Sequence, residues 1–120
     1  MKSHILLCGH TLYHDKVLHG YLRKKFKLYL LSKFENRELF ETILIESITL
    51  VVLEFSKMWE SELKIIRGLL IKYHNLIVIV IDGNSSNEAI IKAFYYGAID
   101  VFRKPYRREL LVERIEALLK

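Results

Sequence analysis

The sequence has very little cysteine and proline, and each shortage excludes a class of protein. Its 120 residues contain one cysteine, one proline and five glycines. Because a lone Cys8 has no partner within the chain, a disulfide-stapled secreted domain is excluded and a reducing cytoplasm is expected. The single proline, Pro105, and the scattered glycines leave no linker or low-complexity segment.

Long apolar runs are also missing. The longest, Leu76 to Ile81 and Leu50 to Leu53, have the length of strands, whereas a bilayer span needs about 18 or more apolar residues. No basic leader followed by an apolar segment and a cleavage site opens the chain. We therefore expect one cytoplasmic domain over residues 1–120, long enough to bury a real core and without a membrane span.

Positive charge is in excess, with a formal net charge of +5 and a pI of about 9.3. The basic residues gather in Arg23–Lys27 and Arg103–Arg108. A charge run most often marks a solvated face, so we do not expect this domain to bind nucleic acid directly. The acids that dilute the two clusters are Glu35, Glu38, Glu41, Glu109, Glu113 and Glu116.

Short apolar runs rich in β-branched residues recur five times and predict strands. They are continuous rather than alternating, which indicates a sheet covered on both faces. The predicted strands are Ile5–Cys8, Leu28–Leu31, Leu50–Phe55, Ile77–Ile81 and Asp100–Arg103.

Amphipathic segments follow each of these runs and predict five helices. Ser85 and Glu88 have the spacing of a capping box at the start of the fourth, and Gly97 ends it. In the second, Leu44 is expected to face inward with Leu39 and Ile43. The predicted helices are Tyr13–Lys25, Arg37–Glu46, Glu62–Tyr73, Asn87–Tyr96 and Arg108–Leu119.

Strand–helix alternation favours parallel strands joined by right-handed crossovers. We therefore predict an α/β fold, a flavodoxin-like doubly wound five-stranded parallel sheet of order 2-1-3-4-5 with helices on both faces. In such sheets ligands bind beyond the carboxyl ends of the strands. The residues expected at those ends are Cys8, Gly9, His10, Glu54, Asp82 and Lys104.

The segment from Gly97 to Pro105 has the pattern G-A-x-D-x-x-x-K-P. This pattern resembles the last strand of response-regulator receiver domains, the CheY-like domains of two-component phosphorelay signal transduction. The spacing of the rest of the chain is also similar. The resemblance implies that Lys104 reaches across the strand ends toward a phosphorylated aspartate, and that the Lys104–Pro105 peptide bond is cis.

The chain departs from the receiver pattern at the residues that carry its chemistry. Receivers bind Mg²⁺ through two acids after the first strand, but Gly9 and His10 stand there and offer no carboxylate oxygen. The phosphoacceptor position is Glu54, and the Ser/Thr switch position is Asp82. We therefore predict a degenerate site with no cofactor and no metal.

A charge cluster remains at this site. Lys104 is expected to pair with Glu54, with Asp82 within reach and Pro105 aiming the lysine inward. Our hypothesis is that the cluster locks the domain in one signalling conformation, Glu54 partly imitating the phosphorylated form; an ordinary salt bridge is the alternative. Glu54 and Asp82 are too few ligands for a metal. His10 and His14 share a helix face, but surface or cap histidines are expected there, as for His19.

These observations predict a pseudo-receiver, a non-enzymatic module that signals by protein–protein interaction without conventional aspartate phosphorylation. One alternative is a receiver phosphorylated at a non-standard residue. Another is a flavodoxin-like phosphotransfer or phosphatase protein using Cys8, since strand–Cys-Gly–loop–helix also opens such proteins. The phosphatase pattern requires an arginine where His14 stands, and a buried core role for Cys8 is expected.

The partner is expected to be another signalling protein, an attached output domain or a second copy of the chain. Receivers commonly dimerise or bind targets through the fourth helix, fifth strand and fifth helix. Asp100 and Arg114 match positions that form interfacial salt bridges in one receiver subfamily. The interface candidates are Lys92, Tyr95, Tyr96, Asp100, Arg103, Arg107 and Arg114.

Overall fold

The computed structural model of the protein describes residues 1–83 and 86–120. All five predicted strands are present and form one sheet of order β2-β1-β3-β4-β5. Every neighbouring pair is parallel, so the predicted flavodoxin-like topology is confirmed. The strands are β1 (His4–Cys8), β2 (Lys27–Leu31), β3 (Leu50–Glu54), β4 (Ile77–Asp82) and β5 (Asp100–Arg103).

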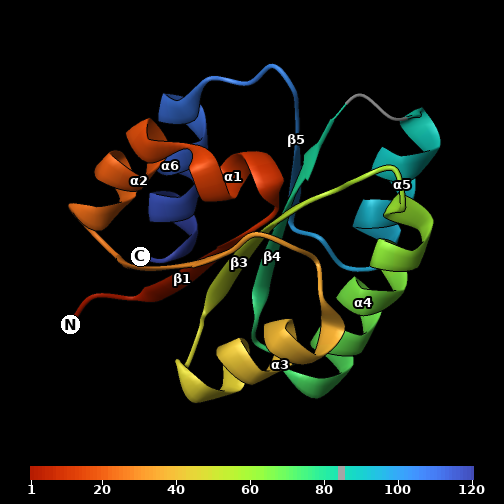
Figure 1. Ribbon diagram of the computed structural model, residues 1–120, viewed down its shortest axis with the longest axis horizontal. Helices are drawn as coiled ribbons and strands as arrows, with labels where there is room; N and C mark the ends of the chain where they lie inside the picture. The colour runs from red at the N-terminus through yellow and green to blue at the C-terminus, as the bar shows by residue number, and fades with distance from the viewer. Residues whose placement is uncertain (84–85) are drawn as a thin grey trace.

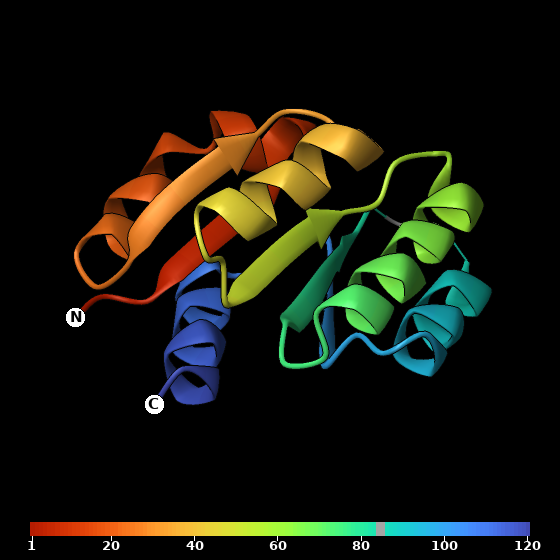
Figure 2. The same ribbon diagram turned by 90° about the horizontal axis from the view of Figure 1, so that it is seen from below.

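Helices cover both faces of this sheet (Figures 1 and 2). Helices α1 (His10–His14), α2 (Lys16–Arg23) and α6 (Arg108–Leu118) pack on one face. The other face carries α3 (Asn36–Ile45), α4 (Trp59–Lys72) and α5 (Asn87–Tyr95).

Alternate residues of each strand feed the two cores. In β1, Leu6 and Cys8 pack beneath α3 and α4, whereas Ile5 and Leu7 pack beneath α2 and α6. Every residue of the central strand β3 is buried. Burial of each Leu or Ile side chain contributes about 1.5–3 kcal/mol to the free energy of folding. The central strands are therefore firmly packed, and the edge formed by their carboxyl ends is rigid.

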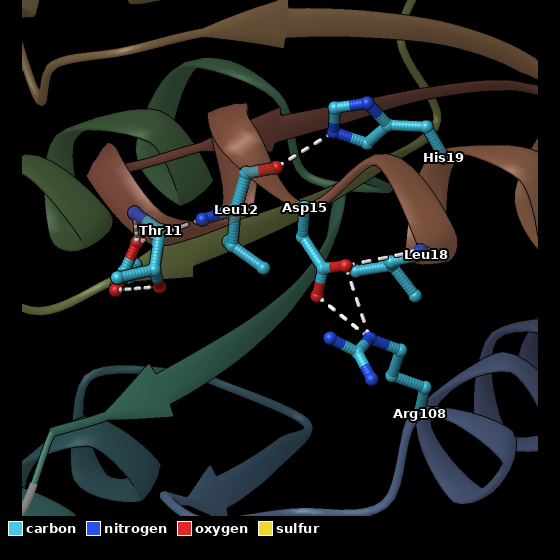
Figure 3. A network of polar contacts seen from close by, with 7 residues as sticks. Thr11, Leu12, Asp15, Leu18, His19 and Arg108 are labelled. Carbon is cyan, nitrogen blue, oxygen red and sulfur yellow. Dashed lines mark hydrogen bonds and ion pairs between the residues drawn. The ribbon is translucent and has the colours of Figure 1, made fainter.

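The segment predicted as one helix over Tyr13–Lys25 is two helices, because Asp15 interrupts it. The Asp15 carboxylate caps α2 by accepting a hydrogen bond from the Leu18 amide at 3.1 Å. It also accepts two from the Arg108 Nε–H, at 3.0 and 2.9 Å, which joins α2 to α6 (Figure 3). The short α1 was not predicted.

His19 was expected at the surface or at a cap, and that expectation is wrong. Its side chain is buried, with ring Nε2 2.7 Å from the carbonyl oxygen of Leu12 (Figure 3). Because a carbonyl only accepts, Nε2 carries the proton and donates it. This contact ties the middle of α1 to the middle of α2.

Three smaller predictions differ from the structure. Leu44 is 61% exposed instead of facing inward, because the α3 stripe that faces the core is set by Leu39 and Ile43. Helix α4 begins at Trp59, three residues earlier than predicted, so Glu62 lies within its first turns, where it is buried. The predicted cap Ser85 lies outside the described residues; Ser86 caps α5 by accepting from the Ala89 amide.

Within the described ranges, no helix is both long and apolar enough to cross a bilayer.

Candidate functional site

The predicted ion pair between Glu54 and Lys104 lies at the carboxyl edge of the sheet. Glu54 ends β3, and its Oε2 contacts the Lys104 ammonium, which follows β5. The same oxygen accepts a hydrogen bond from the hydroxyl of Thr11 in α1. Oε1 accepts from two backbone amides of α1, those of Thr11 at 2.8 Å and Leu12 at 3.2 Å. Each carboxylate oxygen therefore has two donors.

Gly9 makes this arrangement possible. It has a φ of 145°, in the region that favours glycine, and it is buried beneath the Glu54 side chain. A Cβ at position 9 would lie 2.6 Å from Glu54 Oε1, and closer still to Glu54 Cβ. Glycine thus leaves the space through which the longer acidic side chain turns back toward α1.

The surroundings of Glu54 favour its charged form. Burial alone would raise the pKa of the carboxyl, but the hydrogen bonds from Lys104, Thr11 and Leu12 outweigh burial and hold the pKa below its usual value of 4.5. Glu54 is 7% exposed, so the pair is shielded from solvent on the carboxylate side. Lys104 is less enclosed, with 30% of its side chain exposed.

Asp82, the predicted third member of the cluster, is buried and forms an ion pair with the Nε of Arg103 at 3.4 Å. Its backbone carbonyl accepts from the Lys104 amide at 2.9 Å, which fixes the lysine beside the end of β4. Lys104 and Asp82 line a cleft of about 530 Å³. The other residues of this cleft are Phe55, Ser56, Lys57, Trp59 and Gly83.

Glu62 is a buried carboxylate that sequence reasoning missed. Its two oxygens accept from the backbone amide and the hydroxyl of Ser56, both at 2.8 Å, which closes the loop between β3 and α4. Burial raises the pKa of Glu62 above its usual value, although the hydrogen bonds from Ser56 oppose the shift. The two residues are six apart, so the three-residue spacing of a capping box gives no signal here.

Magnesium does not fit this site. Gly9 and His10 supply no side-chain carboxylate, and each oxygen of Glu54 already has two donors. In residues 1–83 and 86–120, no group of three His, Cys, Asp or Glu side chains is arranged to hold a metal ion. His10 and His14 are exposed neighbours on α1, with ring centroids 5.0 Å apart.

Cys8 lies inside the core below the site. It is fully buried, and its thiol donates to the carbonyl of Lys33 at 3.1 Å. Burial, followed by the charges of Glu62, Glu38 and Glu54, raises the pKa of the thiol to about 12. A nucleophilic cysteine needs a lowered pKa and access to solvent, and Cys8 has neither.

Several interface candidates form ion pairs within the chain. Arg114 contacts Asp100 at 3.0 Å, so these two residues, predicted as interfacial, lie together on one molecule. The other interface candidates with an ion pair are Arg103 with Asp82 at 3.4 Å, Lys92 with Glu88 at 2.8 Å and Arg107 with Glu109 at 3.6 Å.

Tyr95 and Tyr96 differ in exposure. Tyr95 is 77% exposed, whereas Tyr96 is half-buried and packs against the core beneath α3, α4 and α5. Their ring centroids lie 5.7 Å apart.

The Lys104–Pro105 peptide bond is cis, as predicted.

Solved structures of response regulators are similar to this fold. One from Thermotoga maritima matches with a TM-score of 0.85 and 22% identity, covering 99% of this chain and 98% of that chain. An orphan response regulator of H. pylori matches with a TM-score of 0.80 and 27% identity over 98% and 97%. A CheY-like protein, TadZ, from Pseudomonas aeruginosa matches with a TM-score of 0.78 and 18% identity over 98% and 94%.

No protein-family model matches the sequence, and no curated protein does. The topology, the helices on both faces and the near-complete coverage of these structures agree with one another. The protein therefore has the CheY-like fold of response-regulator receiver domains.

Proposed function

We propose that the protein is an atypical receiver domain that signals by protein–protein contacts, with the Glu54 carboxylate serving as a permanent internal anion in place of an aspartyl phosphate. One observation carries this proposal: both oxygens of Glu54 are saturated by donors from α1 and from Lys104. The domain is on this view a docking module and not an enzyme.

The donor set around Glu54 is one that suits an anion. Two backbone amides, a hydroxyl and an ammonium are the groups that proteins use to bind phosphoryl oxygens and carboxylates alike. In the family that the sequence resembles, the lysine equivalent to Lys104 reaches a phosphoryl group. In this chain the lysine already has its anion, so the contact that a phosphate would create exists without one.

Phosphorylation of Glu54 is disfavoured by the same contacts. A carboxylate that attacks a phosphoryl donor must expose a lone pair and needs a cation to neutralise the incoming oxygens. Both Glu54 oxygens are engaged, and Gly9 and His10 bring no carboxylate for a cation. We propose that a conventional phosphorelay step does not occur here.

Incubation with acetyl phosphate and Mg²⁺, followed by intact-mass measurement, tests this step. We expect no mass change, with a conventional aspartate-bearing receiver as the positive control. A gain of one phosphoryl group that is lost in Glu54→Gln would overturn the proposal. A gain that persists in Glu54→Gln would identify a receiver phosphorylated at another residue.

The locking role of the ion pair has its own test. Amide spectra recorded for Glu54→Gln and Lys104→Met report whether the loss of the pair reaches α5, β5 and α6, where receivers commonly meet partners. We expect shifts at the Thr11 and Leu12 amides and also on that face. Shifts confined to α1 would reduce the pair to an ordinary salt bridge.

The partner surface that we propose is the face made by α5, β5 and α6, used by a second copy of the chain, another signalling protein or an attached output domain. Large apolar side chains lie exposed on and after α5, among them Ile91 at 67% and Tyr95 at 77%. An exposed aromatic side chain such as Tyr95 supplies contact area at a low entropic cost, because it is rigid.

The enzymatic alternative at Cys8 has no support in the geometry, since the thiol is buried and its pKa is raised to about 12. Iodoacetamide labelling at neutral pH separates the two functions. We expect no labelling of the folded protein and full labelling in urea. Rapid labelling of the folded protein would revive a Cys8 phosphotransfer or phosphatase activity.

A further inference from the structure

The excess positive charge of the protein comes entirely from its first 33 residues. This segment contains seven Lys or Arg and one acid, Asp15, for a formal charge of +6, whereas residues 34–120 contain twelve and thirteen, for −1. The segment forms β1, α1, α2 and the edge strand β2. The charge asymmetry in sequence is therefore an asymmetry in space, at one side of the sheet.

Part of this charge surrounds a cleft at the amino ends of β1 and β2, the edge of the sheet opposite Glu54. Three basic residues, Lys2, Arg23 and Lys27, line it together with His4. The Lys2 ammonium donates to the Arg23 carbonyl at 3.4 Å, so the N-terminal segment lies beside the turn between α2 and β2 (Figures 1 and 2).

This basic cleft has a volume of about 470 Å³, and its remaining walls are apolar. Met1 is fully exposed there, whereas Phe26 is mostly buried beneath the cleft. Leu28, on β2, is half-buried. The lining is therefore mixed, with cationic side chains beside a hydrocarbon wall.

The positive charges of the cleft have few carboxylate partners. Among the ion pairs of the described residues, none involves Lys2, Arg23 or Lys27. Their neighbour Lys25, by contrast, is paired with Glu116 of α6 at 2.9 Å. Clustered like charges repel one another, and an anion placed among them would relieve that repulsion.

The negative end of the α2 dipole accounts for only part of the cluster of cations at the basic cleft. Arg23, in the last turn of α2, is favourable beside the negative end of the helix dipole. The Lys2 ammonium is favourable at the same end, because it donates to the carbonyl of Arg23, the last residue of α2. Lys27 begins β2, so the dipole of α2 does not explain why this third cation lines the same cleft.

We propose that the basic cleft docks an acidic segment of a partner protein, one that carries an apolar side chain among its carboxylates. The carboxylates would pair with Lys2, Arg23 and Lys27, and the apolar side chain would cover Met1 and Leu28. A phosphate backbone would satisfy the cations and leave the hydrocarbon wall bare. This surface lies at the edge opposite the Glu54–Lys104 pair, so its partner and the locking proposal stand or fall separately.

Fluorescence anisotropy with two labelled peptides of equal charge tests the proposal. One peptide repeats Glu-Glu-Leu and the other repeats Glu-Glu-Ser. We expect the leucine peptide to bind about tenfold more tightly, and its affinity to fall about tenfold in the double variant Lys2→Glu with Lys27→Glu. The milder pair Lys2→Gln with Lys27→Gln should give a smaller loss in the same direction.

The matched control is Lys64→Glu with Arg67→Glu, two exposed residues of α4 that change the net charge equally. We expect this control to leave the affinity within about twofold. Equal loss in the control, or equal binding of the two peptides, would overturn the proposal. Tighter binding of single-stranded DNA or of phosphatidylglycerol vesicles than of the leucine peptide would overturn it in favour of those partners.

Discussion

Glu54 has one methylene group more than an aspartate would have, and this extra length determines which neighbouring residues its carboxylate contacts. It carries the Glu54 carboxylate over Gly9 to the amides of Thr11 and Leu12. Gly9 at a position where receivers carry an acid is therefore more than the loss of a metal ligand. The absence of a side chain at Gly9 leaves the space that the Glu54 side chain occupies.

Substitution of Gly9 by alanine tests this relation. The backbone strain at a φ of 145° and the collision with Glu54 together predict a loss of about 2–5 kcal/mol in the free energy of unfolding. Gly20→Ala is the matched control, because nothing lies within 4 Å of a Cβ there and the residue sits inside α2. In the control, the free energy of unfolding measured with urea should rise by about 0.5–1 kcal/mol. Equal effects would contradict the account.

Removal of the lysine gives a pH-dependent prediction. The folded-state pKa of Glu54 is lowered, so its contribution to stability is present above pH 4.5 and is lost as pH falls through the folded-state pKa. Lys104→Met should therefore cost about 1–3 kcal/mol at neutral pH and much less in acid. Urea unfolding of both proteins across this range measures the difference. A loss that is constant with pH would contradict the ion pair.

Sequence reasoning found the Glu54–Lys104 pair through the resemblance to receivers, which implies that Lys104 reaches the phosphoacceptor position held by Glu54. The rule that carboxyl ends of parallel strands meet at one edge agrees with that pairing. It missed Thr11, whose place depends on the unpredicted α1. It missed Glu62 as well, because charged residues in a helix are expected on the solvent side, and only tertiary packing turns this one inward.

At the scale of elements, the division of the first helix depends on one side chain. The apolar spacing of Leu18 and Leu22 correctly predicts α2, and the same stripe extends without a visible break toward Tyr13. Asp15 ends that continuity by capping α2 and pairing with Arg108. The sequence offers no signal that distinguishes this cap from a solvent-facing aspartate inside one longer helix.

Two substitutions of Asp15 separate its roles. Asp15→Asn keeps an oxygen for the Leu18 amide and loses the charge that faces Arg108, which is 45% exposed, so we expect a loss within about 0–1 kcal/mol. Asp15→Ala also removes the cap and should cost about 1 kcal/mol more. Thermal unfolding measures both. Equal stability of the two variants would mean that the cap contributes nothing to the division of the helix.

At the scale of the whole molecule, the topology was predictable from the sequence, whereas the surface that meets a partner stays a prediction. Continuous apolar strands and the run from Gly97 to Pro105 indicate a doubly wound sheet with a receiver-like edge, and the structure has that sheet. Asp100 and Arg114 match interfacial positions in sequence and also pair within one molecule, and their role at an interface stays a prediction. Which surfaces meet a partner depends on exposure, which a sequence pattern does not report.

Sedimentation velocity tests the proposed self-association through α5, β5 and α6. We expect the sedimentation coefficient to rise with protein concentration, and Tyr95→Glu, which places a charge at a 77% exposed position, to abolish that rise. Ile45→Glu, at a 71% exposed position of α3, which is not one of the three elements of that face, is the matched control and should associate normally. A concentration-independent monomer would restrict this face to other partners.

The central claim, that Glu54 is a permanent buried anion held by Lys104, is tested most directly by a pH titration of the Glu54 carboxyl carbon by ¹³C NMR. The account predicts a pKa below the ordinary 4.5 in the natural protein and a higher pKa in Lys104→Met. A pKa at or above 4.5 in the natural protein, or one that Lys104→Met leaves unchanged, would contradict it.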